Sequence, residues 1–504
     1  MSSPSSDSAI PNLPPQELRK LLLGLMLALL MAALDQTIVA AALPRISSDL
    51  KGFELLAWVV SGYLIAAAVA TPIYGKLGDL YGRRVMLISA IWIFLLASVA
   101  CALANSMLML VIARIAQGIG GGGLFAITQA AVADVVTPRE RARYQGYFSV
   151  TYATASVAGP VLGGLLTEYL TWEWIFWINL PLGAAALYIT RNSLHHLPVP
   201  HIRSQIDFLG ALLLCTGLAA GMIGFTRVGQ GEAWLSDTNI ALFLSSLLVL
   251  AVFLFQQSRT EQPIIPLRLF RIPVIALCLT ILFFNFSQLI AVTTLIPLRA
   301  QMVAGLAADI SALQLVPLTL GSPLGAFLGG MLVARTGRYK PAMIIGACLL
   351  PLGLITVALI DPANLLVGTI ALAITGFSIG IQLPTSLVAV QYASPRAQMG
   401  VATASTTFAR QLGASILVAV ATAILMGALG GSAGGAALAN SGAEMMRELV
   451  SSKMAGMDPA ERGRLALIAA DAFQRTILVC AAMTLLSLLL VWRLPDHVLH
   501  DRAK

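Results

Sequence analysis

Residues 21–44 read LLLGLMLALLMAALDQTIVAAALP, and this stretch decides the fold class. At about 1.5 Å per residue the run is long enough to cross a hydrocarbon core of roughly 30 Å. It carries one charge, Asp35. A carboxylate in hydrocarbon costs on the order of 3 kcal/mol, so we expect Asp35 to face a cavity or a partner. Reversible proton binding is the functional interpretation, and a structural hydrogen bond to a neighbouring helix is the alternative.

The rest of the chain has the same apolar character. Of its 504 residues, 58% are hydrophobic and only 11% are charged, whereas soluble domains carry about 25% charged residues. This composition excludes a soluble enzyme and predicts an all-α polytopic membrane protein. Apolar runs of about 20 residues predict fourteen spans, at 20–43, 55–75, 85–104, 107–133, 144–166, 173–190, 207–227, 238–256, 273–297, 310–333, 341–360, 364–390, 401–428 and 467–493.

Basic residues lie on alternate loops between these spans. One set of loops and tails holds 20 lysines and arginines, whereas the short loops of the other set hold only Arg45, Lys51, Arg227 and Arg299. By the positive-inside rule both termini are cytoplasmic, which requires an even number of spans. Because the net charge of +8 is distributed in this way, nucleic acid is not an expected partner.

A polar motif, GKLGDLYGRRVML, follows the second span at residues 75–87. Gly75 and Gly82 permit a tight reversal, Asp79 can cap a helix, and Arg83 and Arg84 can pair with carboxylates or lipid phosphates. The pattern G-x-x-x-D-x-x-G-R-R resembles the signature loop of the major facilitator superfamily, between its second and third helices. The resemblance implies that these five residues latch the cytoplasmic side in one conformation.

An internal repeat indicates two halves. Residues 330–339 repeat residues 75–84 at an offset of 255, with Ala334 in place of Asp79 and Tyr339 in place of Arg84. A parallel repeat of this kind fits the superfamily, and loss of the carboxylate predicts a latch centred on the first half. The predicted organisation is a cytoplasmic tail at 1–19, six-helix bundles at 20–200 and 273–494, two extra helices at 207–257, and a long outer loop at 429–466.

Arg114, in the fourth span, is the predicted partner of Asp35. An arginine within hydrocarbon stays charged and needs a carboxylate, carbonyls or water. Asp35 is the other charged group of comparable depth, so we assign both residues to proton coupling. The sequence R-x-x-Q-G, formed by Arg114, Gln117 and Gly118, also resembles the fourth-helix motif of proton-coupled facilitators.

The fifth span contains Gly159-Pro160 followed by Gly163-Gly164. These residues predict a kinkable helix with a small-residue face that slides against a neighbour from the other half. The pattern resembles the fifth-helix signature of antiporters. Together with the fourteen spans and the sequence L-D-x-T-I-V-x-x-A-L-P around Asp35, it resembles the fourteen-helix drug:proton antiporter branch.

Further polar and aromatic residues in the spans are candidates for a substrate cavity. They are Gln36, Trp58, Tyr63, Gln117, Tyr152, Phe284, Asn285, Gln288, Gln314 and Gln382. Helix packing is the alternative role for the aromatic residues, and interhelical hydrogen bonding is the alternative for the amides. Arg410, near the cytoplasmic end of its span, is a candidate gate or packing residue whose side chain could reach the interface.

The resemblance implies a proton-coupled multidrug exporter in the cytoplasmic membrane that moves amphipathic or cationic compounds by alternating access. We expect no metal and no cofactor, the proton motive force being the energy source, because the chain lacks a GxxxxGK[ST] phosphate loop. Expected partners are a small-molecule substrate, protons and membrane lipids. A monomer is expected, and an accessory export protein is left open. The alternatives are a narrow exporter of one metabolite, sugar or organic acid, and a non-transporting sensor with a transporter fold.

Overall fold

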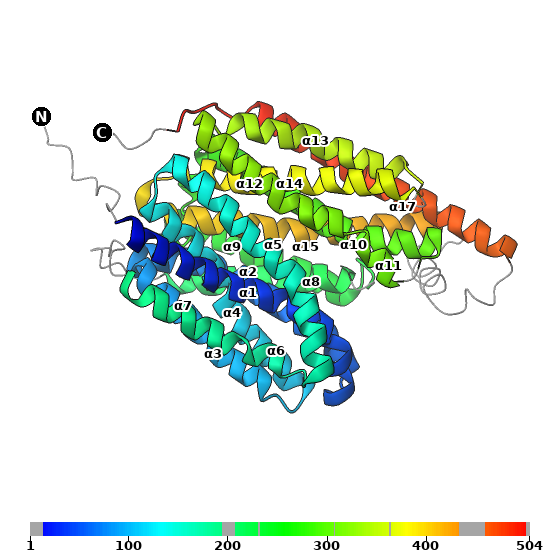
Figure 1. Ribbon diagram of the computed structural model, residues 1–504, viewed down its shortest axis with the longest axis horizontal. Helices are drawn as coiled ribbons and strands as arrows, with labels where there is room; N and C mark the ends of the chain where they lie inside the picture. Colours follow the sequence, from blue (N-terminus) through cyan, green and yellow to red (C-terminus); the bar gives the residue numbers. More distant parts are fainter. Residues whose placement is uncertain are drawn as a thin grey trace, which may run out of the picture.

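The computed structural model describes residues 14–193, 207–229, 232–306, 308–361, 364–432 and 459–499. The described chain forms a bundle of long helices (Figure 1), because backbone polar groups in hydrocarbon must bond within their own segment. Thirteen helices are long and apolar enough to cross a membrane, and residues 174–190 form a shorter apolar helical segment. All fourteen predicted spans are therefore helical.

The first half of the chain is followed by an extra pair of helices. The first half comprises α1 (Pro15–Leu50), α2 (Leu56–Tyr81), α3 (Arg83–Ala102), α4 (Met107–Val135), α5 (Pro138–Tyr169), α6 (Trp174–Trp177) and α7 (Asn179–Ser193). The extra pair is α8 (Phe208–Gly229) and α9 (Asp237–Arg259). The sixth span is thus interrupted at Ile178, where α6 ends and α7 begins.

The second half comprises α10 (Pro273–Ala304), α11 (Ala308–Leu313), α12 (Val316–Thr336), α13 (Lys340–Leu359), α14 (Leu365–Ala393), α15 (Met399–Ser432) and α17 (Pro459–Trp492). The start of α1 and the C-terminal end of α17 lie at the same end of the bundle (Figure 1). We call this end, which carries the basic loops, the cytoplasmic end.

Two helices extend past the predicted limits of their spans. Helix α1 starts at Pro15, which occupies the first helical turn, where a missing N–H does no harm. Residues 15–19 of the predicted tail are therefore helical. Helix α15 continues to Ser432 and α17 starts at Pro459, so both ends of the predicted 429–466 loop are helical. Residues 433–458 lie outside the described part.

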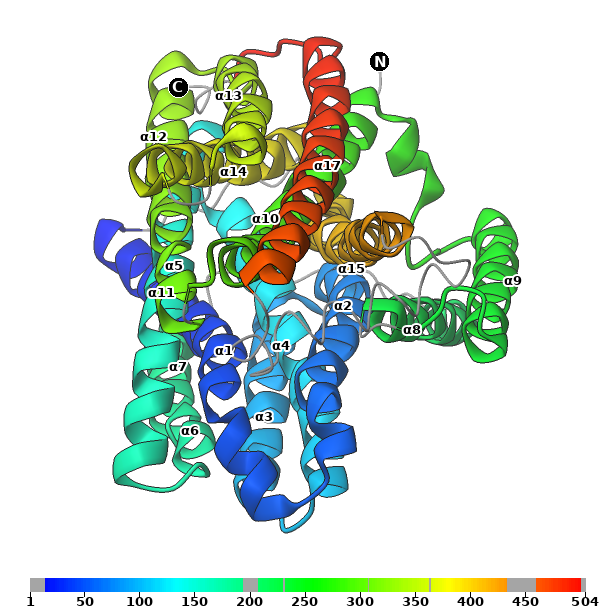
Figure 2. The same ribbon diagram turned by 90° about the vertical axis from the view of Figure 1, so that its right-hand side faces the viewer.

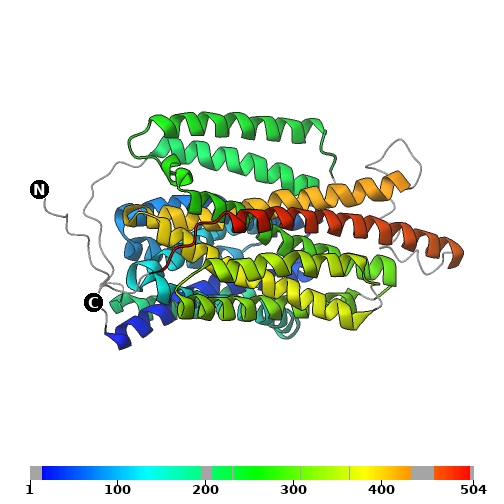
Figure 3. The same cartoon turned by 90° about the horizontal axis from the view of Figure 1, so that it is seen from above.

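The extra pair lies beside the two halves. Figure 2 shows α8 next to α2 and α15, with α9 outside it, and Figure 3 shows the same pair (green) along one edge of the bundle. Leu214 and Leu218 of α8 are buried in a cluster to which Val69 of α2 and Phe408 of α15 also contribute. Helix α8 therefore covers the seam where the first half meets the second.

Close helix contacts occur where glycines replace larger residues. A Cβ atom at Gly122 of α4 would overlap the carbonyl oxygen of Ala67 in α2, and one at Gly118 would overlap that of Tyr63. Because α2 and α4 touch backbone to backbone, they are expected to move as one unit.

The glycines of α5 pack on a different neighbour from the one expected. A Cβ atom at Gly163 would lie 2.6 Å from the carbonyl oxygen of Ile38, and one at Gly159 would overlap the side chain of Thr37. Both contacts are with α1 of the same half, so the predicted contact with the other half was wrong for these positions. The reason is that α5 lies between α1 and α12, and Gly146, nearer the cytoplasmic end, faces Phe327 of α12.

This geometry separates the two adjacent glycines of the motif. Gly164 has nothing within 4 Å of its Cβ position. We expect Gly163→Ala to lower stability by about 1–3 kcal/mol, because α1 and α5 must separate, and Gly164→Ala to change it by less than about 0.5 kcal/mol. Heating the purified protein in detergent and recording the fraction that remains monodisperse measures both variants. Equal thermal stability of the two would contradict the packing described.

Candidate functional site

The ion pair between Asp35 and Arg114 lies deep in the first half. The Arg114 guanidinium donates to Asp35 Oδ2 at 2.6 Å, and the side chains of Arg114 and Asp35 are 1% and 0% exposed, respectively. The contact expected between these residues is present. A buried pair of this kind is held only while both charges remain, since removal of one partner leaves the other uncompensated.

Asp35 is also held by two amides. Its Oδ1 accepts from Gln117 Nε2 at 2.8 Å and from Asn179 Nδ2 at 2.9 Å. Both amides donate in addition to Ser98 Oγ, and Gln117 Oε1 accepts a bond of 2.6 Å from Arg114. Every group that contacts the carboxylate is therefore a hydrogen-bond donor.

The guanidinium of Arg114 has further neighbours from α2 and α6. Its Nε donates to the carbonyl oxygen of Val59 at 3.2 Å. Its central carbon lies 4.2 Å from the ring centre of Tyr63 and 5.9 Å from that of Phe176, within cation–π range. The Tyr63 hydroxyl is buried without a hydrogen-bond partner among the described residues.

We call Asp35, Ser98, Tyr63, Arg114, Gln117 and Asn179 the Asp35 cluster. Gln117 and Tyr63 were predicted to line the substrate cavity, and the structure places both here instead. The sequence analysis missed Asn179 and Ser98. Asn179 did carry a signal, being the polar residue within the apolar stretch WIFWINLPLG.

The remaining cavity candidates of the first half are Gln36, Tyr152 and Trp58. The Tyr152 hydroxyl donates to Gln36 Oε1 at 3.2 Å, both side chains are partly buried, and the Tyr152 ring lies 6.3 Å from that of Phe125. Trp58 packs against a cluster formed by Ile65 and Ala68 of α2 and Met222 of α8, which is the packing alternative considered for it.

In the second half the amides join helices. Asn285 of α10 donates to Gln382 of α14 at 2.7 Å, and Gln288 is buried beside them on α10. Interhelical hydrogen bonding, the stated alternative, therefore describes Asn285 and Gln382. The ring of Phe284 packs edge-on against Phe283, with centroids 5.3 Å apart.

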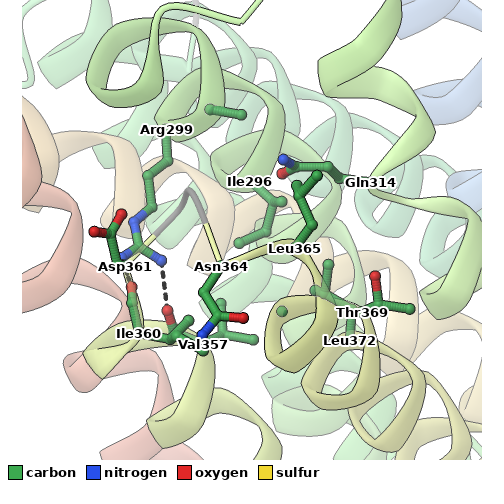
Figure 4. A pocket seen from close by; sticks show the side chains of 12 residues that line it. Ile296, Arg299, Gln314, Val357, Ile360, Asp361, Asn364, Leu365, Thr369 and Leu372 are labelled. Atoms are coloured by element: carbon green, nitrogen blue, oxygen red, sulfur yellow. Dashed lines mark hydrogen bonds between the residues drawn. The ribbon is translucent and has the colours of Figure 1, made fainter.

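Gln314 lines a separate pocket between α10, α13 and α14 (Figure 4). There the Arg299 side chain donates to the carbonyl oxygens of Val357 and Ile360, the latter at 2.6 Å, at the C-terminal end of α13. The cavity measures about 50 Å³, far below the roughly 300–1,000 Å³ of drug-sized sites. Arg299 therefore caps a helix, and the pocket is too small for a drug-sized substrate.

Arg410 lies within α15, and the contacts of its side chain are with Thr407 and Phe286. Helix α15 begins at Met399, which places Arg410 roughly 16 Å along the helix axis. There its side chain is partly buried, donates to Thr407 Oγ1 at 3.1 Å, and lies 5.5 Å from the ring centre of Phe286 in α10.

The latch motif joins the halves at the cytoplasmic end. Asp79 accepts from the backbone N–H groups of Gly400 at 2.8 Å and Val401 at 2.9 Å, so a carboxylate of the first half caps α15 of the second. Arg83 pairs with Asp79 at 2.5 Å and with Asp134 of α4 at 2.9 Å.

Three further motif residues shape this contact. Gly82, at φ +89°, adopts a backbone conformation that favours glycine and separates α2 from α3. A Cβ atom at Gly75 would lie 2.7 Å from the carbonyl oxygen of Gly400, so a side chain there would force α2 and α15 apart. Arg84, at the start of α3, is partly exposed.

The second repeat closes the opposite seam with different chemistry. Arg139 of α5 donates to the carbonyl oxygens of Ala334 and Arg335 near the end of α12. Ala334 occupies the position that corresponds to Asp79 in the first repeat. At the α5–α12 seam an arginine therefore binds helix carbonyl groups, whereas at the α2–α15 seam a carboxylate binds helix N–H groups. Another cross-half bond, from Gln391 to the Gln129 carbonyl oxygen at 3.3 Å, lies at the same end. The described conformation is thus closed on its cytoplasmic side.

The comparisons with known proteins agree with this architecture. The sequence model of the Major Facilitator Superfamily matches residues 25–418. The chain belongs to the major facilitator superfamily. It is 34% identical over 406 residues to an uncharacterised MFS-type transporter of Mycobacterium tuberculosis, which covers 80% of this chain but only 59% of that relative's length.

Two other comparisons concern transport and fold. The chain is 32% identical over 407 residues to the multidrug transporter protein MdtP of Bacillus subtilis, covering 80% of this chain and 75% of MdtP. The solved structure of the proton:xylose symporter XylE superposes with a TM-score of 0.60 at 15% identity, covering 95% of this chain and 96% of that one. That likeness shows a shared fold alone.

The Asp79 cap gives a prediction about the conformational balance. Asp79→Asn removes the charge from both the helix cap and the Arg83 pair, together worth about 1–3 kcal/mol, so the inward-facing population should rise several-fold. Distances between spin labels on the cytoplasmic ends of α5 and α12 measure this population. Arg338→Gln is the control, because Arg338 forms an exposed pair with Asp496 in the second repeat. An unchanged distance distribution in Asp79→Asn would contradict a latch role.

Proposed function

We propose that this transporter is a proton-driven antiporter of the cytoplasmic membrane that exports amphipathic compounds. The observation that carries the proposal is the Asp35 cluster: a titratable carboxylate held in an ion pair within the membrane-spanning part of the protein. Export is favoured by the likeness to MdtP, whose name describes it as a multidrug transporter, and by the Gly159-Pro160 and Gly163-Gly164 motif. The fold itself does not decide direction, because a symporter shares it.

The proton acts through the ion pair. In the cytoplasm-closed conformation Asp35 is fully buried and paired with Arg114, so proton exchange requires a second conformation that opens a wet route to it. Protonation from outside neutralises Asp35 and releases Arg114 to its neutral neighbours. Return to an inward-open state then exposes Asp35 to the more alkaline cytoplasm, where the proton leaves.

Substrate and proton need not share a binding atom. Each shifts the balance between the two conformations only by its differential affinity for them. The Asp79 cap on α15 supplies the two-state element, because it exists only while the cytoplasmic side is closed. The energy source is then the proton motive force, with protons and a small molecule as the transported partners.

The test is proton flux in reconstituted vesicles. Addition of a transported compound to wild-type vesicles should release protons, and Asp35→Asn should abolish gradient-driven accumulation of that compound. Because Asp35→Asn leaves Arg114 buried without its counter-charge, the double variant Asp35→Asn/Arg114→Gln serves as a second, charge-balanced test and should be equally inactive. Uphill transport at the wild-type rate in either variant would overturn the coupling role.

Controls separate the alternatives. Asp471→Asn removes a carboxylate from an exposed pair on α17 and should leave transport unchanged. Proton release with one metabolite but with none of a panel of amphipathic dyes would identify a narrow exporter. Absence of flux with every compound, from protein that is folded, would favour the sensor.

A further inference from the structure

Charged side chains deep in the membrane-spanning helices are few, and one of them lacks a counter-ion. Asp35 and Arg114 neutralise each other. Arg410 is different: in the described part of the chain no carboxylate lies within ion-pair distance of it. An arginine stays charged at any working pH, so the surroundings of Arg410 are net positive.

Arg410 lies between the two halves. Helix α15 occupies the middle of the bundle and contacts α2 and α4 of the first half as well as α10 and α17 of the second (Figure 2). Its guanidinium faces the ring of Phe286 on α10 of the second half.

The guanidinium has unused donors. One terminal nitrogen donates to Thr407 Oγ1. The other nitrogens have no hydrogen-bond partner among the described residues and are not fully buried. A cation with free donors at this depth is stable only beside water or an anionic ligand.

The local chemistry selects the sign of the substrate charge. Asp35 is fully buried and already paired, so it offers nothing to a cation in this conformation. An acidic group could accept two parallel hydrogen bonds from the planar guanidinium. An aromatic body attached to it would lie against Phe286.

We propose that Arg410 binds the acidic group of the exported compound, and that the substrate class is therefore amphipathic organic acids and not lipophilic cations. This inference rests on the proposed function and narrows its substrate. It replaces the gate or packing role that the sequence suggested for Arg410, and it disfavours the cationic compounds that the family resemblance implied.

Equilibrium binding tests the proposal without a proton gradient. The full-length protein in lipid nanodiscs is titrated with the anionic dye carboxyfluorescein and with the cationic dye ethidium, and bound dye is followed by fluorescence anisotropy. The wild type should bind carboxyfluorescein more tightly than ethidium. Arg410→Gln should weaken carboxyfluorescein binding by about tenfold or more, the scale of a lost charge-assisted hydrogen bond.

Matched variants exclude a purely structural effect. Arg410→Lys keeps the charge but loses the planar pair of donors, so it should retain part of the anion affinity, whereas Arg475→Gln, an exposed arginine on α17, should change nothing. Equal loss of both dyes in Arg410→Gln, or ethidium binding tighter than carboxyfluorescein in the wild type, would overturn the inference. Because no gradient is present, this result is independent of the Asp35→Asn transport assay, so either proposal can fail without the other.

Discussion

The structure depends on one electrostatic constraint, the burial of the Asp35–Arg114 pair away from water. An ionised pair in a low-dielectric interior is tolerable only with good geometry and further hydrogen bonds, and the cluster supplies both from several helices. Gln117 and Asn179 donate hydrogen bonds to the Asp35 carboxylate. The Arg114 guanidinium donates to the Val59 carbonyl oxygen and lies over the Tyr63 ring. A change in the charge of Asp35 therefore alters the contacts between α1, α2, α4 and α7 at the same time.

A physical path links this cluster to the cytoplasmic latch. Helix α4 carries Arg114 near one end and Asp134, a partner of Arg83, 20 residues further on, a distance of about 30 Å along the axis. Helix α2 likewise carries Tyr63 and Asp79. The glycines of α4 bring its backbone into contact with α2. A tilt that starts at the ion pair therefore moves Asp79 and Asp134, the two carboxylates that bind Arg83, together.

The sequence predicted the features that follow from its apolar composition and from the small number of charged residues within the spans. It predicted the fourteen helical spans and the two-half repeat. It also predicted the contact of Asp35 with Arg114, because an isolated charge in hydrocarbon requires a counter-charge. It could not assign Tyr63 and Gln117 to that cluster, since doing so requires the rotation of α2 and α4 about their axes. The position of α8 and α9 over the α2–α15 seam was equally hidden, because the residues that α8 packs there are apolar and do not specify a neighbour.

The two seams that close the cytoplasmic side differ in whether their capping residue can change its charge. At the α2–α15 seam the cap on helix N–H groups is Asp79, a group whose charge depends on protonation and on its pair with Arg83. At the α5–α12 seam the cap on helix carbonyls is Arg139, whose charge is permanent. Only the first seam can therefore respond to a proton or to a shift of Arg83. Helix α8 packs on the same two helices, against Val69 of α2 and Phe408 of α15.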